Sequence, residues 1–427
     1  MKKVLIITYY WPPAGGPGVQ RWLKFVKYLP QFGVKPVVYC PKNPNYPLVD
    51  TNLIAEVAQK IEIIKQPIFE PYQFASIFSK KQTKTIASGI INTKKQSFVE
   101  KTLLYIRGNF FIPDARKFWV KPSVKYLNNY IQKNKIDTII TTGPPHSVHL
   151  IGLQLQAQLN VKWIADFRDP WTTIGYHQKL KLTKASEQKH KQLEPQVLQN
   201  ANEILVTSPT TKLDFQQITQ QPIAVITNGF DDINLGKVNL DDKFTISHIG
   251  SLLAERNPIV LWKVLSELIQ ENTNFSTHFE LKLIGAVSNE VLKSIQQAGL
   301  QPNLNVLGYV SHQEAQLAQQ KSQVLLLIEI DSEITKCIIP GKLFEYLQSG
   351  RPILGFGPQN ADFKTIISQT NTGKSFGYAA SEKKEIKNYI LTCFESYQQK
   401  QLKANGIGIQ KYHRKQLTQQ LVSVLNS

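Results

Sequence analysis

The sequence has only three cysteines, Cys40, Cys337 and Cys393, and they are far apart. Their spacing matches no zinc site, and an odd number argues against a framework of disulfides. Such cysteine usage fits a reducing compartment, so we expect a cytoplasmic protein. The sequence also lacks any run of about 18 apolar residues, the length that a helix needs to cross a bilayer. If the protein meets a membrane, we therefore expect it to lie peripherally on the inner face.

Acidic residues are also few. The chain has 50 Lys and Arg against 31 Asp and Glu, a net charge of +19. An excess of this size predicts an anionic partner, such as lipid head groups, phosphorylated substrates or nucleic acid. We disfavour nucleic acid, because no known binding motif accompanies the charge.

One segment carries much of the excess charge. Residues 79–135 contain thirteen Lys and Arg and two acids. Aromatic residues are interleaved with the basic ones: Phe98, Tyr105, Phe110, Phe111, Phe118, Trp119, Tyr126 and Tyr130. Exposed aromatics beside cations would suit an anionic membrane surface or a lipid-diphosphate acceptor. The alternative is that the aromatics are core and the lysines form a solvated face.

Several familiar catalytic patterns are missing. The chain has no Asp-x-Asp triplet and no cluster of His and Cys, so it shows no ligands for a metal and we expect no cofactor. A glycine-rich stretch with Gly15 and Gly16 follows an expected strand and precedes an expected helix. Its spacing is not that of a dinucleotide-binding loop, and no Walker lysine follows it.

Apolar runs alternate with segments of helical periodicity, which is typical of α/β units with parallel sheets. The expected strands of the first half are Val4–Thr8, Pro36–Cys40, Ile61–Ile64, Thr138–Thr142, Lys162–Ala165, Glu203–Thr207 and Ile223–Ile226. Those of the second half are Phe244–Ile249, Glu280–Ile284, Leu304–Leu307, Val324–Ile330, Pro352–Phe356 and Gly373–Phe376. We predict two doubly wound halves that bind ligands at the carboxyl ends of their strands, in a cleft between them.

The most informative stretch is Ile339–Leu354, which predicts a turn, a short helix, a glycine stop and a buried strand. Pro340 and Gly341 open the helix, where free N–H groups favour an anion. Lys342 could neutralise a phosphate there, and Glu345, one turn on, could accept hydrogen bonds from a ribose. The alternative is a surface helix with an ion pair between these two residues.

This stretch resembles the donor-nucleotide helix of GT-B glycosyltransferases, especially the bacterial family-4-like group. The resemblance implies two Rossmann-like domains that face each other across a cleft. We expect residues 1–235 to form the acceptor-side domain, with the basic insertion at about 79–135, and residues 236–395 to bind the nucleotide-sugar. Residues 396–427 would be a helical tail that crosses back to the first domain.

The resemblance also implies an activity: transfer of a sugar from a nucleotide-sugar, which is a substrate and not a cofactor, to a hydroxyl of a glycan or lipid-linked acceptor. By analogy the transfer would retain the anomeric configuration, need no metal and serve cell-surface polysaccharide biosynthesis. The catalytic residues it implies are His146, Arg256 and Lys342. Those implied for the donor are Gly15, Gly16, Gly250, Ser251, Tyr309, Val310, Gly341 and Glu345. Those implied for the acceptor or sugar are Asp166, Arg168 and Asp169.

Some positions leave alternatives open. His149 could act in place of His146, and Asp166, Arg168 and Asp169 could form a buried salt-bridge network instead. The family's first acid of a Glu-x7-Glu pair falls at Cys337, which leaves Glu333 as the nearest candidate. Two other functions also remain: a sugar-nucleotide epimerase of similar fold, and a non-enzymatic basic adaptor for membranes or nucleic acid.

Overall fold

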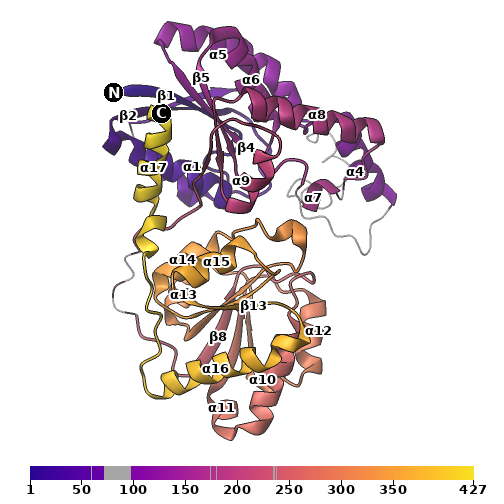
Figure 1. Ribbon diagram of the computed structural model, residues 1–427, viewed down its shortest axis with the longest axis vertical. Coiled ribbons are helices and arrows are strands. Elements are labelled where there is room, and N and C mark those ends of the chain that lie inside the picture. The colour runs from indigo at the N-terminus through magenta and orange to yellow at the C-terminus, as the bar shows by residue number, and fades with distance from the viewer. Residues whose placement is uncertain (59, 72–97, 174, 179, 234–235, 237) are drawn as a thin grey trace. The chain divides into compact units, whose positions relative to one another are not determined.

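The computed structural model describes residues 1–427 except residue 59, residues 72–97, residues 174 and 179, residues 234 and 235, and residue 237. The chain divides into two compact units (Figure 1). Residues 1–228 and 414–427 form the first unit, and residues 229–413 form the second. Each unit is built around one parallel β-sheet.

The first unit has a seven-stranded sheet in the order β3-β2-β1-β4-β5-β6-β7. Its strands are β1 (Lys2–Thr8), β2 (Val34–Pro41), β3 (Glu62–Gln66), β4 (Thr138–Gly143), β5 (Lys162–Phe167), β6 (Glu203–Val206) and β7 (Ile223–Val225). Its helices are α1 (Pro17–Tyr28), α4 (Phe98–Phe110), α5 (Val120–Asn134), α6 (Ser147–Leu159), α7 (Gly175–Gln178), α8 (Lys184–Asn200), α9 (Pro209–Gln216) and α17 (Arg414–Asn426).

Both faces of this sheet are covered, which explains why its strands are almost continuously apolar. One face forms a core with α5 and α6, and the other packs against α1 and α17. Leu417, Leu421 and Leu425 of α17 join the core that contains Trp22 of α1. The end of the chain is therefore part of the first unit, and Figure 1 shows α17 beside α1.

The second unit has a six-stranded parallel sheet in the order β10-β9-β8-β11-β12-β13. Its strands are β8 (Phe244–Ile249), β9 (Phe279–Ile284), β10 (Leu304–Leu307), β11 (Val324–Ile328), β12 (Ile353–Phe356) and β13 (Gly373–Phe376). Its helices are α10 (Ile259–Glu271), α11 (Thr273–His278), α12 (Asn289–Gln297), α13 (His312–Lys321), α14 (Lys342–Ser349), α15 (Asp362–Gln369) and α16 (Lys383–Gln398). One core lies against α10, α12 and α16, and another against α14 and α15.

The thirteen strands expected from the sequence are all present, with ends that differ by at most two residues. The predicted doubly wound α/β architecture is therefore confirmed. In both sheets the first strand lies between the second and the fourth strands of its unit. The first three strands therefore extend the sheet to one side, and the strands from the fourth onward extend it to the other side. These switch points, β1/β4 in the first unit and β8/β11 in the second, are where such folds bind ligands.

Candidate functional site

The β8/β11 switch point is marked by an early end to the pairing of its two strands. β8 and β11 pair only at Ile246–Val324 and Ser247–Leu325, although both strands continue further. His248 lies just beyond the last pair, at the carboxyl end of β8. The polar residues around this position are the strongest candidates for a ligand site in the second unit.

Lys342, the first residue of α14, lies over the end of β8. Gly341 precedes it, as the sequence predicts, and the helix ends at Gly350 in the left-handed conformation. The Nζ of Lys342 lies 3.3 Å from His248 Nε2. A Cβ on Gly250 would come within 2.9 Å of the same Nζ, and Gly250 has a φ of 122°. Position 250 thus needs glycine both for its backbone and for the approach of the lysine.

The environment of Lys342 disfavours its charge. Burial lowers the pKa of Lys342 to about 7, the charge of Arg256 lowers it as well, and the carboxylates of Glu329 and Glu345 oppose this shift. An anion placed beside the lysine would favour the charged form. This part of the second unit is thus suited to receive a negatively charged ligand.

Arg256 lies in the same cluster, as the sequence predicts, but it already has a carboxylate partner. Its Nη2 lies 2.9 Å from Oε1 of Glu329, and its Nε lies 3.1 Å from the same oxygen. Glu329 follows β11, is buried, and also accepts a hydrogen bond from the backbone N–H of Ile330. The side chain of Arg256 is 28% exposed, so part of the guanidinium can still meet a ligand.

Glu345 does not form the surface ion pair that the sequence left as an alternative. Its Oε2 accepts a hydrogen bond of 2.7 Å from Gln319 Nε2, while Lys342 lies against His248. Glu333, the candidate for the missing family acid, pairs with Lys336 on the surface. The buried acid of this cluster is Glu329, which was not among the predicted site residues because it lies inside the expected strand Val324–Ile330.

The remaining donor-side predictions fall on loops of the same unit. Ser251 is exposed, and Tyr309 is 91% exposed, while Val310 packs partly against the core. Ser311 and Glu314 form a capping box at the start of α13.

One expectation in this unit is wrong. In the sequence, Asn257-Pro258 predicts an N-cap followed by the first residue of a helix, but in the structure Pro258 holds the cap position and α10 begins at Ile259. The Asn257 side chain instead bonds Trp262 Nε1 and Ser294, so it joins two helices.

In the first unit, the glycine-rich loop leads from β1 into α1. Gly15 donates its N–H to the carbonyl of Leu48, and Gly16 has a φ of 99° directly before the helix. A Cβ on Gly18 would overlap Nη1 of Arg168, at only 1.5 Å. Arg168 therefore lies against the first turn of α1. Its Nε also donates to the carbonyl of Gly143, the last residue of β4.

Asp166 occupies the buried network that the sequence left as an alternative to sugar binding. The residue has no exposed surface. Its Oδ1 accepts from Arg21 Nη2 at 2.9 Å, and its Oδ2 accepts from Trp22 and Thr142 at 2.7 and 2.8 Å. Burial alone would raise the pKa of this carboxyl, but Arg21 and the three hydrogen bonds lower it. Both oxygens are occupied, so we withdraw Asp166 from the sugar-binding residues.

Asp169 and His146 differ from Asp166 because neither has a hydrogen-bond partner among the described residues. Burial raises the pKa of Asp169, although Arg168 opposes the shift. His146 is buried and stacks on Trp171, with ring centroids 4.8 Å apart. Burial and the neighbouring histidines hold its pKa well below the usual value, so the ring is neutral. Both side chains thus retain unused polar atoms that a ligand could engage.

His149, the other histidine considered, has a structural partner. Its Nδ1 lies 2.9 Å from Thr141 Oγ1, and its ring stacks on Phe167. Two further buried histidines, His177 and His190, lie near the same aromatic group, and Trp171 donates to His190 Nδ1. The sequence offered no signal for this cluster, because its members come from three different helices.

No group of three or more metal-binding side chains is found among the residues that the structure describes. Within the same residues, none of the helices is both long and apolar enough to cross a membrane.

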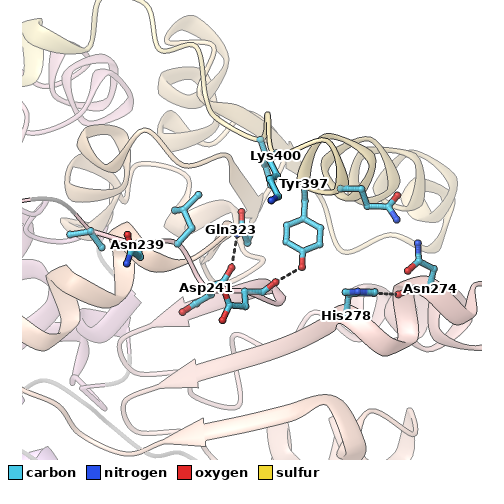
Figure 2. A pocket seen from close by; sticks show the side chains of 12 residues that line it. Asn239, Asp241, Asn274, His278, Gln323, Tyr397 and Lys400 are labelled. Carbon is cyan, nitrogen blue, oxygen red and sulfur yellow. Dashed lines mark hydrogen bonds between the residues drawn. The ribbon is translucent and has the colours of Figure 1, made fainter.

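A separate pocket of about 660 Å³ lies at the opposite edge of the second sheet (Figure 2). Asp242, His278 and Gln323 come just before β8, β9 and β11, so the pocket is at the amino ends of the strands. Gln323 Nε2 and the Tyr397 hydroxyl donate to the backbone carbonyls of Asp241 and Asp242. These side chains are engaged in joining the segment before β8 to its neighbours, which favours a structural role.

No protein-family model and no curated protein sequence matches the chain. Solved structures match it in fold. Anabaena Alr3699/HepE, in complex with UDP and glucose, has a TM-score of 0.58 and 14% identity, and the match covers 100% of both chains. WaaG, a glycosyltransferase involved in lipopolysaccharide biosynthesis, has a TM-score of 0.53 and 10% identity, with 99% of this chain and 100% of that chain covered.

The fold is GT-B. A candidate UDP-N-acetylglucosamine 2-epimerase from Listeria monocytogenes also matches, with a TM-score of 0.55, 13% identity, and coverage of 100% of this chain and 96% of that chain. Since one fold holds both kinds of protein, the GT-B fold alone does not assign the reaction.

Proposed function

We propose that this protein is a glycosyltransferase that moves a sugar from a nucleotide-sugar to a hydroxyl of a glycan or lipid-linked acceptor. The observation that carries the proposal is the pair of cations, Lys342 and Arg256, at the switch point of a GT-B unit. Cleaving the sugar from its nucleotide leaves negative charge on the diphosphate. Fixed cations in a partly buried site stabilise that charge.

The donor would bind along the carboxyl edge of the second sheet. Lys342, Arg256 and the N-terminus of α14 would neutralise the diphosphate. Glu345 would accept hydrogen bonds from the ribose. The other proposed donor-binding residues are Gly250, Ser251, Tyr309, Val310 and Gly341 from this unit and Gly15 and Gly16 from the first. Since protein cations supply the positive charge, we propose a metal-independent transfer, and by analogy one that retains the anomeric configuration.

The first unit would supply the acceptor side. His146 and Asp169 have unused polar atoms, and Arg168 lies at the first turn of α1. We propose that His146 contacts the transferred sugar and that Arg168 and Asp169 bind the sugar or the acceptor. A role in cell-surface polysaccharide biosynthesis, on the inner face of a membrane, would follow from a lipid-linked acceptor.

Two rival functions make different demands on the protein. A sugar-nucleotide epimerase would use the same donor site but would need no acceptor. A basic adaptor would need no nucleotide site at all. Nucleotide binding therefore separates the adaptor from both enzymes, and acceptor dependence separates the two enzymes from each other.

The test begins with calorimetric titration of the full chain with UDP, GDP and ADP. The tightest binder then defines a panel of nucleotide-sugars, and release of the nucleoside diphosphate is measured with and without oligosaccharide or lipid-phosphate acceptors. We expect binding in the micromolar range and release that acceptors accelerate. Absence of nucleotide binding would exclude both enzymes, and conversion of the donor into an epimer would assign the rival reaction.

Removal of metal gives a further prediction. We expect sugar transfer to be unchanged in excess EDTA, because Lys342 and Arg256 supply the charge that a divalent cation would otherwise provide. Loss of activity in EDTA that Mg²⁺ or Mn²⁺ restores would contradict the proposed mechanism.

A further inference from the structure

We propose that His248 is a positioning residue that holds the Lys342 ammonium where the donor diphosphate binds. The inference rests on the proposed function, because it takes the diphosphate to be the ligand of Lys342. His248 itself would not touch the substrate. Its contribution would be to fix the direction in which the lysine points.

The place of His248 in the sheet fixes its ring. The pairing of β8 with β11 ends at Ser247–Leu325, one residue before His248. The next carbonyl of β11, that of Leu326, lies 3.0 Å from His248 Nδ1. A carbonyl oxygen only accepts hydrogen bonds, so Nδ1 must carry the proton and donate it. The ring thus takes over the contact to β11 at the position where the ladder between the two strands ends.

This tautomer leaves a lone pair on Nε2, which faces Lys342. The ring has no exposed surface, and the distance from Nε2 to Nζ is 3.3 Å. Burial and the neighbouring charge of Lys342 hold the pKa of His248 well below its usual value, although hydrogen bonds of the ring to the backbone of Leu326 and Ser251 oppose this shift, so the ring stays neutral. His248 is therefore a fixed acceptor for one N–H of the ammonium, which has two further N–H groups to offer a ligand.

The other charged groups around Lys342 act from a greater distance. They are Arg256 after β8, Glu329 after β11 and Glu345 on α14, and Tyr378 adds a hydroxyl that bonds the backbone carbonyl of Glu329. Among the described residues, no carboxylate lies within ion-pair distance of Lys342, since Glu329 is held by Arg256. His248 is thus the direct hydrogen-bond partner that orients the ammonium.

The binding of a diphosphate should consequently depend on pH. In the free protein the pKa of Lys342 is lowered to about 7, and a bound anion would raise it. Above pH 7 the protein must then take up a proton to bind, so the affinity falls as pH rises, by up to about tenfold for each unit. The second ionisation of a phosphate lies near pH 6, below this window.

Two substitutions separate orientation of the lysine from support of the fold. In His248→Asn, the amide can still donate to the Leu326 carbonyl, but nothing reaches Lys342. In His248→Gln, the longer side chain can place an oxygen near the Nε2 position and accept from the lysine. A merely structural role for His248 would give no reason for Gln to restore nucleotide binding.

The experiment is calorimetric titration of the full chain with the tightest of UDP, GDP and ADP, from pH 6.5 to 9. At pH 7.5 we expect His248→Asn to bind about tenfold more weakly, the effect of losing one hydrogen bond to a charged group. His248→Gln should bind within about threefold of the native protein. The fall in affinity with pH should begin at lower pH in His248→Asn, because the ammonium has lost its acceptor, and His248→Gln should reverse this shift.

The decisive control is the Lys342→Met background, in which His248→Asn should cause no further loss of affinity. The inference is overturned if Asn and Gln weaken binding equally, or if Asn weakens it as much when Lys342 is absent. A native protein that binds no nucleotide would refute the proposed function itself. Native binding that His248→Asn leaves unchanged would refute only the role of His248.

Discussion

The two units share a strand order but differ at their switch points. In the first unit, β1 and β4 remain paired as far as Thr8–Thr142, close to their ends. In the second, β8 and β11 lose their pairing after Ser247–Leu325, and His248 bridges to β11 with its side chain. The same topology thus leads to one switch point closed by backbone pairs and another bridged by a side chain.

The two units also differ in how their charged side chains are paired. In the first unit, Arg21 forms a buried ion pair with Asp166, whose other oxygen accepts from Trp22 and Thr142. In the second, the direct partner of Lys342 among the described residues is a neutral histidine, and Arg256 is partly exposed. Removing one partner of a buried ion pair destabilises the fold, whereas a charge held without a counter-ion is available to a ligand. The comparison therefore favours a structural role for Asp166 and supports the proposed role of Lys342 in binding the donor.

The largest expected effect is on stability, from Asp166→Asn. This change leaves Arg21 charged and without a full partner in the core, which should cost about 3–5 kcal/mol of unfolding free energy. Urea denaturation at pH 7 measures it. The pKa of Asp166 is lower in the folded protein than in the unfolded chain, so its contribution is present above about pH 4 and is lost as pH falls through the folded pKa.

Asp169→Asn is the matched control, three residues further along. Its carboxylate has no hydrogen bond to lose among the described residues, and its raised pKa means that the fold disfavours the ionised form, so Asn should leave the free energy of unfolding unchanged or raise it. If both variants unfold alike, the contrast between a satisfied and an unsatisfied carboxylate is wrong.

Lys342→Ala should have the next largest effect, on nucleotide binding. Loss of a charge-assisted hydrogen bond costs about 1.5–3 kcal/mol, so the dissociation constant for the nucleoside diphosphate should rise tenfold or more. Glu345→Ala should also weaken binding while leaving the fold intact, because it removes the proposed ribose acceptor.

Lys336→Ala is the control for charge alone, because Lys336 pairs with Glu333 on the surface. We expect it to bind nucleotide as the native protein does. Unchanged affinity in both Lys342→Ala and Glu345→Ala would remove the donor assignment.

A smaller effect is expected from His146→Phe, which keeps a ring to stack on Trp171 but removes both nitrogens. Turnover should fall about tenfold, the value of one hydrogen bond, with little change in nucleotide affinity. Steady-state rates and titrations on the same preparation measure both. Native turnover in His146→Phe with inactivity in His149→Ala, after thermal unfolding has shown that both fold, would mean that His149 is the functional histidine.

The sequence predicted the sheets well because each strand is a short apolar run between turn signals. Val4–Thr8 and Phe244–Ile249, for example, needed no long-range information. The position of Lys342 was also predictable, since Pro340 and Gly341 define the start of its helix.

The partners of these residues were not predictable, because they come from distant segments. Asp166 was assigned to the sugar because nothing in the sequence shows that Arg21 and Trp22, about 145 residues earlier, reach it. Glu329 and His248 were overlooked for the same reason: their roles appear only when β8 and β11 lie side by side. The spacing of residues in the sequence predicts which side chains share one helix or strand. It does not predict which side chains of two different elements pack together.

The smallest expected effect concerns the basic segment 79–135, whose lysines 80, 81, 94 and 95 lie outside the described residues. In the described part of this segment, some aromatic side chains are exposed and others are buried. Phe110 is 63% exposed and Phe118 43% exposed, whereas Trp119 is buried, so the expectation that Trp119 is free to enter a membrane is wrong. Phe69, Phe111 and Phe118 lie edge to face, and Lys117 lies over the last two rings.

We expect this aromatic patch, Phe69, Phe110, Phe111 and Phe118, to bind anionic vesicles reversibly. Each nearby cation contributes about 1 kcal/mol, and salt screens it beyond about 8 Å. Sedimentation with phosphatidylserine vesicles should recover the protein at low salt and release it at high salt. Charge reversal of Lys101 and Lys121 should weaken binding, and Phe110→Ser should weaken it at any salt, because it removes apolar contact. The same reversal at Lys411 and Lys415 in the C-terminal region is the control. A native protein that stays in the supernatant at low salt would show that the basic segment is only a solvated face, and the lipid-linked acceptor would lose its main support.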